Sequence, residues 1–218
     1  MMFPMSNISF AINLASIIEF YNKLYYCTEN LTYNHMKHLF IISLVILAGC
    51  NNKTEETVVV EDLYNYDVEE RLTELGIKLT EPGAPVANYV NSVKTGNLVF
   101  MAGKGPKNEE GEYITGKVGR DLSVEEGYEA AKLTAIQQLA VLKAEIGDLN
   151  KVVQIVKVLG MVNADSTFTN HPEVINGFSD LMVEVFGDRG KHARAAVGMG
   201  SLPRNIACEI EFIVEVRN

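Results

Sequence analysis

The spacing of hydrophobic positions changes along the chain and predicts an alternation of helices and strands. From Ser123 to Gly147, apolar residues recur every three or four positions, which predicts a long helix that Ser123 begins, with Glu126 three residues later completing a capping box. The residues on its apolar face are Val124, Tyr128, Ala131, Ala135, Leu139, Leu142 and Ile146. A nearly unbroken run of Val and Ile over 152–162 predicts a strand that is buried on both sides.

Weaker patterns predict the remaining elements. They are a short helix over 69–75, a strand over 98–102 and a turn-rich hairpin arm over 111–119. A second long helix is expected from about Pro172 to Gly187, because Pro favours a helix start and Gly a helix end. Its apolar stripe consists of Val174, Phe178, Leu181 and Val185.

The C-terminal part of the chain predicts two strands joined by a Gly/Ser/Pro/Asn turn. Alternation places Arg194, Ala196 and Gly198 on one face of the first strand. In the second strand the apolar residues share one face, and Glu209, Glu211 and Glu215 share the other. The predicted order is β-β-α-β-α-β-β, which indicates an α+β fold, a two-layer mixed sheet with two helices on one side.

Arg194 and Glu209 are the candidate catalytic pair. Small neighbours leave space beside the planar and permanently charged guanidinium of Arg194, which suits a ligand carboxylate. Glu209 could then activate a water molecule. The alternative interpretation is a structural ion pair between Arg194 and the glutamates of the neighbouring strand.

Composition narrows the choice of partners. The chain has 218 residues, a formal net charge of −9 and a sequence pI near 5.0, so sequence-independent binding of nucleic acid is not expected. The three cysteines and four histidines follow no metal-ligand spacing, and neither a dinucleotide fingerprint nor a phosphate-binding loop is present in the sequence. The sequence therefore predicts no metal and no cofactor.

The N-terminal region indicates a lipid anchor. Residues 36–49 combine a short basic start with an apolar stretch, as a signal peptide does, and they are followed by Cys50. Leu47-Ala48-Gly49-Cys50 resembles the bacterial lipobox, in which the cysteine is lipidated. The predicted localisation is therefore the bacterial cell envelope, periplasmic or outer membrane, with the membrane as a partner through lipidated Cys50. The alternative is an ordinary signal peptide with a chance cysteine.

Domain boundaries follow from this interpretation. Residues 1–35 are expected to be an over-extended gene start or untranslated leader, with a genuine longer signal as the alternative. Residues 50–68 are polar and acidic, and this composition predicts a tether that carries the lipidated cysteine. Residues 69–218 form the folded domain.

Three motifs of the C-terminal region resemble one family. An Ala193-Arg194 pair lies in a small-residue strand, Leu202-Pro203 follows it, and Glu209-Ile210-Glu211 lies in the final strand. This combination resembles the Rid family of reactive intermediate deaminases, also known as YjgF-type or "endoribonuclease L-PSP" proteins. The resemblance extends over about residues 72–216.

The resemblance implies a chorismate-mutase-like fold, a homotrimer with a cleft between subunits, and hydrolysis of amino-acid-derived enamines or 2-imino acids to 2-oxo acids and ammonia. By the same resemblance, Arg194 binds the substrate carboxylate and Glu209 positions or activates water. It assigns cleft closure to Tyr89, a polar contact to Asn176, and a backbone position of the substrate site to Gly103.

Two departures from the family pattern change the polarity of the expected site. The segment around Gly103 reads Ala102-Gly103-Lys104, so a methyl and an ammonium replace the family's hydroxyl and amide. Ala195-Ala196 stands where the family has Ser-Cys. If Lys104 points inward, it would favour a more anionic ligand.

Two functional classes remain open from the sequence. The first is an exported Rid-type deaminase, and the second is a trimeric envelope lipoprotein that binds a small carboxylate-bearing ligand without turning it over. An envelope location makes the second class a serious alternative, because reactive imines arise from cytoplasmic enzymes and an envelope deaminase lacks an obvious supply of substrate. A structural or chaperone-like role is a third class with little positive support.

Overall fold

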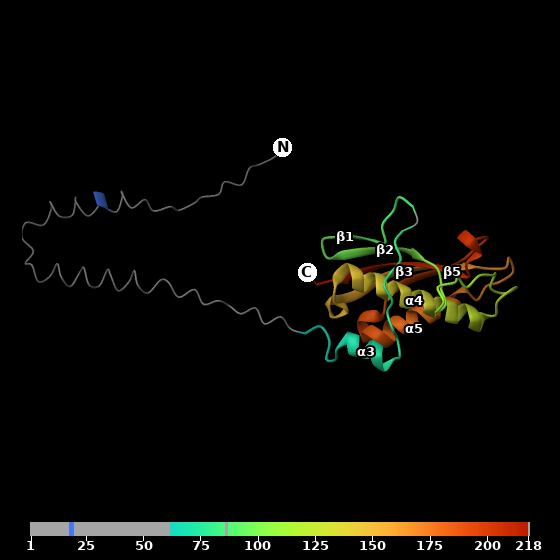
Figure 1. Cartoon of the computed structure of the whole chain (residues 1–218), viewed down its shortest axis with the longest axis horizontal. Helices are drawn as coiled ribbons and strands as arrows, with labels where there is room; N and C mark the ends of the chain where they lie inside the picture. The colour runs from blue at the N-terminus through green and yellow to red at the C-terminus, as the bar shows by residue number, and fades with distance from the viewer. Residues whose placement is uncertain (1–17, 20–61, 86, 218) are drawn as a thin grey trace, which may run out of the picture. The chain divides into compact units, whose positions relative to one another are not determined.

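A five-stranded sheet with helices on one face forms the folded part of the chain (Figure 1). The structure is a computed structural model, and it describes residues 18–19, 62–85 and 87–217. The elements in chain order are α3 (Val68–Glu74), β1 (Ser92–Thr95), β2 (Leu98–Lys104), α4 (Val124–Ile146), β3 (Val152–Asn163), α5 (His171–Phe186), β4 (Ala193–Met199) and β5 (Cys208–Val216).

The strands run in the order β1-β2-β5-β3-β4, with β3 and β4 parallel and all other pairs antiparallel. The C-terminal strand β5 therefore lies between β2 and β3. In Figure 1, α4 and α5 lie below the sheet, and α3 lies below α5. This confirms the predicted α+β fold with a mixed sheet and two covering helices, and α3 corresponds to the short helix predicted over 69–75.

Local signals fix the ends of the two long helices where the sequence predicts them. The hydroxyl of Ser123 accepts a hydrogen bond of 3.1 Å from the backbone amide of Glu126. In return, the carboxylate of Glu126 accepts a hydrogen bond of 2.8 Å from the backbone amide of Ser123. Gly147 ends α4 with a φ of 79°, and Gly187 ends α5 with a φ of 58°.

Two glycines allow the layers to approach closely. A Cβ atom on Gly177 of α5 would overlap the backbone carbonyl of Tyr128 in α4. A Cβ atom on Gly160 of β3 would overlap the side chain of Ile175 in α5. The absence of a side chain at both positions therefore sets the spacing between α4, α5 and the sheet.

The first hairpin lies earlier in the chain than predicted. Strand β1 precedes β2, and the two-residue Gly96-Asn97 turn joins them, with Thr95 paired to Leu98. The arm over 111–119 contains only isolated bridges, among them Thr115 to Ile206. A Gly-Asn dipeptide between two β-prone segments is a hairpin signal, so this strand was detectable in the sequence.

The prediction that β3 is buried on both sides is wrong for the face that points away from the helices. Ile155, Val158 and Val162 are fully buried beneath the helices, whereas Val156 and Lys157 are exposed on the opposite side. The described residues provide a helical layer on one face only. We call the other face of the sheet the open face.

The packed part of the chain already includes residues 63–68, within the segment expected to act as a tether. The Tyr64 hydroxyl donates to the Val152 carbonyl at 2.6 Å, and the Tyr66 hydroxyl donates to the Val185 carbonyl at 3.0 Å. The expected leader over 1–35, apart from residues 18–19, lies outside the described residues, as do the signal over 36–49 and Cys50. Among the helices that the structure describes, none is long and apolar enough to cross a membrane.

Candidate functional site

The sheet register places the two predicted catalytic residues on opposite faces. Val158 of β3 is paired with Arg194 on one side and with Phe212 on the other, so these side chains point toward the helices. Met161 is paired with Val197 and with Glu209, and it lies three positions after Val158, an odd offset that puts its side chain on the opposite face. Glu209 therefore lies on the open face, and Arg194 and Glu209 do not meet within one chain.

Arg194 is held by neutral acceptors from α5. Its Nη1 donates to Asn176 Oδ1 at 2.9 Å and to the Ser179 hydroxyl at 3.0 Å, and its Nη2 donates to the Pro172 carbonyl at 3.5 Å. Within residues 62–85 and 87–217, no carboxylate lies within ion-pair distance of its guanidinium. The structural ion pair with the glutamates of β5 is therefore not formed.

His192 fixes the orientation of this cluster. Its Nδ1 lies 2.7 Å from the Gly190 carbonyl, which can only accept, so Nδ1 carries the proton and Nε2 accepts from the Ser179 hydroxyl at 3.0 Å. Burial lowers the pKa of His192, and the charge of Arg194 lowers that pKa further, against a raising effect of the Gly190 bond. The neutral ring therefore directs the Ser179 oxygen toward Arg194.

The half-buried guanidinium keeps donors for a ligand. Three of its five N–H groups have partners among the described residues, which leaves two for an external acceptor. A planar cation with unused donors is suited to a carboxylate. Ser179 and His192 were missed in the sequence, although Ser179 lies one helical turn after Asn176, and His192 shares a strand face with Arg194.

Gly103 and Glu209 form the second part of the predicted site. The pairing of β2 with β5 shifts between Met101 and Lys104, and Gly103 lies in this irregular segment. A Cβ atom on Gly103 would overlap the Glu209 carboxylate, so the two residues are in close contact. Burial raises the pKa of Glu209, and the negative charge of Glu211 raises it further. Both effects make this carboxylate a better proton acceptor near neutral pH.

Gln138 supports the irregular segment of β2 from below. Its side chain is fully buried, and Nε2 donates to the Ala102 carbonyl at 2.9 Å and to the Ile210 carbonyl at 2.7 Å. One amide group thus ties α4 to β2 and β5 beside Gly103. The helical spacing of Gln138 from Ala135 places it on the predicted apolar face, which was a usable signal for a buried polar role.

The remaining candidates lie apart from these two clusters. Tyr89 lies in the loop before β1 with 48% of its surface exposed, and among the described residues no hydrogen bond joins it to another predicted site residue. Lys104 is half-buried, and its Nζ donates to Asn91 Oδ1 at 2.5 Å rather than pairing with Glu209. The substrate contact expected of Tyr89 stays a prediction.

The described residues contain no group of three or more His, Cys, Asp or Glu side chains that could hold a metal ion. Cys208 is fully buried with its sulfur 3.6 Å from the Thr134 hydroxyl. Burial raises the pKa of the Cys208 thiol to about 12, so it stays protonated and is a poor nucleophile.

Comparison with known proteins identifies the family to which this fold belongs. Residues 69–216 match the family model described as "YjgF/chorismate mutase-like, putative endoribonuclease". Protein TCP17 of Trypanosoma cruzi is 43% identical over 148 residues, which cover 67% of this chain and 92% of that protein.

Two solved structures are similar over a comparable share of the chain. The protein Atu1372 of Agrobacterium tumefaciens is 43% identical with a TM-score of 0.63, over 69% of this chain and 94% of that chain. A Shewanella oneidensis MR-1 protein described as a "putative endoribonuclease" is 31% identical with a TM-score of 0.67, over 69% of this chain and all of that one. The chain therefore belongs to the YjgF/chorismate mutase-like family, the Rid family that its C-terminal motifs resemble.

Proposed function

We propose that this protein is a Rid-type deaminase that hydrolyses 2-imino acids derived from amino acids to 2-oxo acids and ammonia. The observation that carries the proposal is the state of Arg194. A half-buried cation without a carboxylate partner in the described chain, oriented by Asn176 and Ser179, favours an anionic ligand. The α-carboxylate of an imino acid supplies that anion.

The chemistry requires little beyond positioning. Arg194 holds the substrate carboxylate, and a water oxygen attacks the electrophilic imine carbon while the C=N π electrons move to nitrogen. Glu209 takes the proton of the attacking water and returns it to that nitrogen. The carbinolamine hydroxyl then gives its proton, through Glu209, to the same nitrogen, so that the C–N bond breaks, ammonia leaves and the carbonyl of the 2-oxo acid forms. General base catalysis of this kind contributes about 10²–10⁴-fold.

A second copy of the chain is needed to bring the two groups together. Arg194 and Glu209 lie on opposite faces and two strands apart, about 10 Å by strand spacing alone. The open face carries exposed apolar side chains from β1 to β4, namely Val93, Phe100, Val156 and Val197. We therefore propose a homotrimer in which one subunit contributes Arg194 and its neighbour contributes Glu209.

The location belongs to the proposal as well. Lipidation of Cys50 would hold the trimer at the bacterial cell envelope, on the periplasmic side or in the outer membrane. Metabolic labelling with a radioactive fatty acid tests this directly. Label should enter the wild-type protein and be absent from the Cys50→Ser variant, and label in both would contradict the anchor.

The decisive experiment measures ammonia release from 2-imino acids generated in situ by an amino-acid oxidase. Arg194→Ala and Glu209→Gln should each lower kcat/KM about 100-fold or more. Arg194→Ala removes the charged contact to the substrate carboxylate, and Glu209→Gln removes the proton acceptor. Arg120→Ala is the matched control, since Arg120 is exposed and paired with Asp121.

Mixed trimers then test whether the site is shared. Trimers assembled from Arg194→Ala and Glu209→Gln subunits contain some clefts with both native residues, so activity should return. If the mixture stays inactive, the two residues do not act across subunits. If the wild-type protein binds a 2-oxo acid but releases no ammonia from any imino acid, the non-catalytic carboxylate-binding alternative replaces the deaminase.

A further inference from the structure

The arm after β2 and the turn between β4 and β5 bring two cations to one aromatic ring. The Nζ of Lys107 lies 4.8 Å from the centroid of the Tyr113 ring, and the guanidinium carbon of Arg204 lies 5.4 Å from it. Arg204 Nη1 also lies 3.3 Å from the Tyr113 hydroxyl and donates to it. Lys107 and Tyr113 are themselves paired in an isolated β-bridge. Segments about 90 residues apart thus share one cationic cluster.

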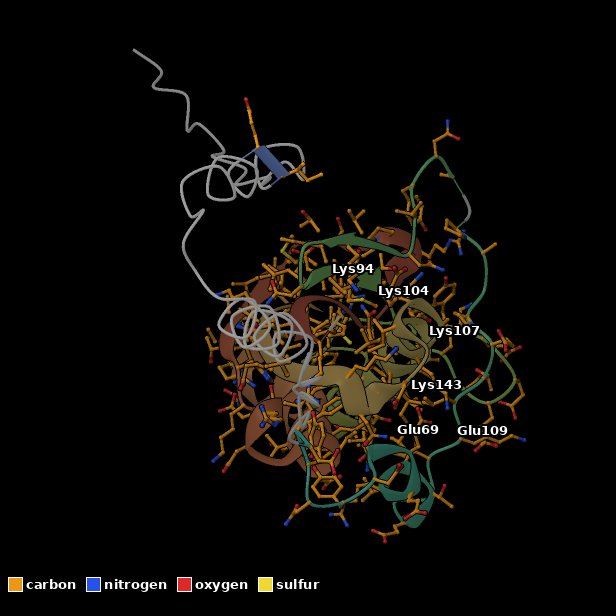
Figure 2. The ribbon with its side chains drawn as sticks, turned by 90° about the vertical axis from the view of Figure 1, so that its left-hand side faces the viewer. Glu69, Lys94, Lys104, Lys107, Glu109 and Lys143 are labelled. Carbon is orange, nitrogen blue, oxygen red and sulfur yellow. The ribbon has the colours of Figure 1, made fainter. Side chains whose placement is uncertain are left out.

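These cations are not neutralised within the part of the chain that the structure describes. Arg120 is paired with Asp121 and Lys191 with Asp188, whereas neither Lys107 nor Arg204 has a carboxylate within ion-pair distance. The whole chain has a net charge of −9, so carboxylates are abundant. Figure 2 shows Glu109, from the same arm, well separated from Lys107.

A third cation lies close to this cluster. Figure 2 shows Lys104 next to Lys107, and Lys104 is half-buried at the end of β2. Burial lowers the pKa of Lys104, and the positive charge of Lys107 lowers it further. An anion between these groups would relieve their mutual repulsion.

The backbone that presents Arg204 is rigid and strained. Arg204 and Asn205 have φ values of 55° and 57°, in the left-handed region that residues other than glycine rarely adopt. Asn205 is fixed there by hydrogen bonds of 2.8 Å from the Gly116 amide to its carbonyl and of 2.9 Å from Asn163 Nδ2 to its Oδ1. Strain of this kind persists where surrounding structure enforces it and is common at ligand sites. These hydrogen bonds therefore hold the backbone that carries Arg204.

We propose that Lys107, Tyr113 and Arg204 form a second anion site, separate from Arg194, that binds a phosphate group. A guanidinium and an ammonium that lie against the same ring, with no carboxylate within ion-pair distance in the described residues, suit a dianionic phosphate better than a single carboxylate. None of these three residues is assigned to the proposed deaminase site, so the second site does not rest on that reaction.

The test is titration of the full chain with inorganic phosphate by calorimetry, at an ionic strength held constant with chloride. Lys107→Gln and Arg204→Gln should each weaken phosphate binding at least tenfold. Arg120→Gln removes one positive charge outside the cluster and should bind as the wild type does. Absence of phosphate-specific heat, or equal affinity in all four proteins, would overturn the proposal.

A second variant separates binding from folding. Arg204→Gly removes the cation but places glycine where φ is positive, so the turn should fold at least as well as before. Retained thermal stability with lost phosphate binding supports the site, and retained binding contradicts it. Titration with a sugar phosphate then distinguishes the two sources of the group. Tighter binding than inorganic phosphate indicates a phosphomonoester, and weaker binding indicates the free ion.

Discussion

The two faces of the sheet differ in how completely the described part of the chain covers them. On the helix face, Ile155, Val158 and Val162 are fully buried, and Gly160 and Gly177 bring the layers into direct contact. On the open face, Phe100 and Val197 remain exposed beside a half-buried Glu209. One face holds the fold together, and the other presents apolar and acidic groups without a cover from the described chain.

This difference separates stability from assembly. Substitutions on the helix face should destabilise the fold, because close-packed interiors accommodate extra atoms poorly. Substitutions on the open face should leave the fold intact and change what it binds. Arg194 lies between these cases, since it faces α5 but keeps donors for a ligand. Four changes, from the largest expected effect to the smallest, test this comparison.

Gly177→Ala should have the largest effect on stability. The new methyl group would overlap the Tyr128 carbonyl and force α4 and α5 apart, which destabilises by about 1–3 kcal/mol. Urea denaturation measures the loss. Gly83→Ala is the matched control, because a Cβ atom there meets nothing within 4 Å. Equal stability of the two variants would show that the helices are not in limiting contact.

Phe100→Asp should break the assembly and leave the fold. A carboxylate on the open face would be buried without a partner in the proposed trimer, and this desolvation opposes association of the subunits. Light scattering should show a monomer with unchanged circular dichroism. Ala144→Asp places the same charge on the exposed side of α4 and should remain trimeric. A wild-type monomer, or a trimeric Phe100→Asp, would refute the assignment of this face.

Gly103→Ala should lower deaminase activity about tenfold at nearly unchanged stability. The added methyl displaces the Glu209 carboxylate, and even a small displacement of a reacting group lowers the reaction rate strongly. The side chain of Glu209 can rotate away, so the free energy of unfolding should change by less than about 1 kcal/mol. Gly200→Ala, which meets no atom within 4 Å, serves as the control. Full activity in Gly103→Ala would remove Glu209 from the mechanism.

His192→Gln should have the smallest effect, visible only as a change with pH. The pKa of His192 is lowered in the folded state, so the unfolded chain binds its proton first as the pH falls below about 6.5. The wild type should therefore lose stability between pH 7 and pH 5, and the variant should lose less. Urea denaturation at both pH values measures this difference. Identical losses would mean that the ring is not held neutral beside Arg194.

Local signals account for the parts of this protein that the sequence predicted. The capping box at Ser123, the stop at Gly187 and the alternation around Arg194 depend on neighbouring residues and backbone conformation. Each is present in the structure at the expected position. The sequence likewise placed Arg194 and Glu209 on defined strand faces, because side chains alternate along a strand whatever its neighbours are.

Long-range pairing decided the rest. The sequence determined two helices, the strands around them and the candidate residues on those strands. Only the tertiary structure set β5 between β2 and β3, which brings Glu209 onto Gly103 and separates it from Arg194. Only packing supplied Ser179, His192 and Gln138 as partners of the site. The physical reason is that these contacts join segments far apart in the chain, and local propensity carries no information about which distant segments pair.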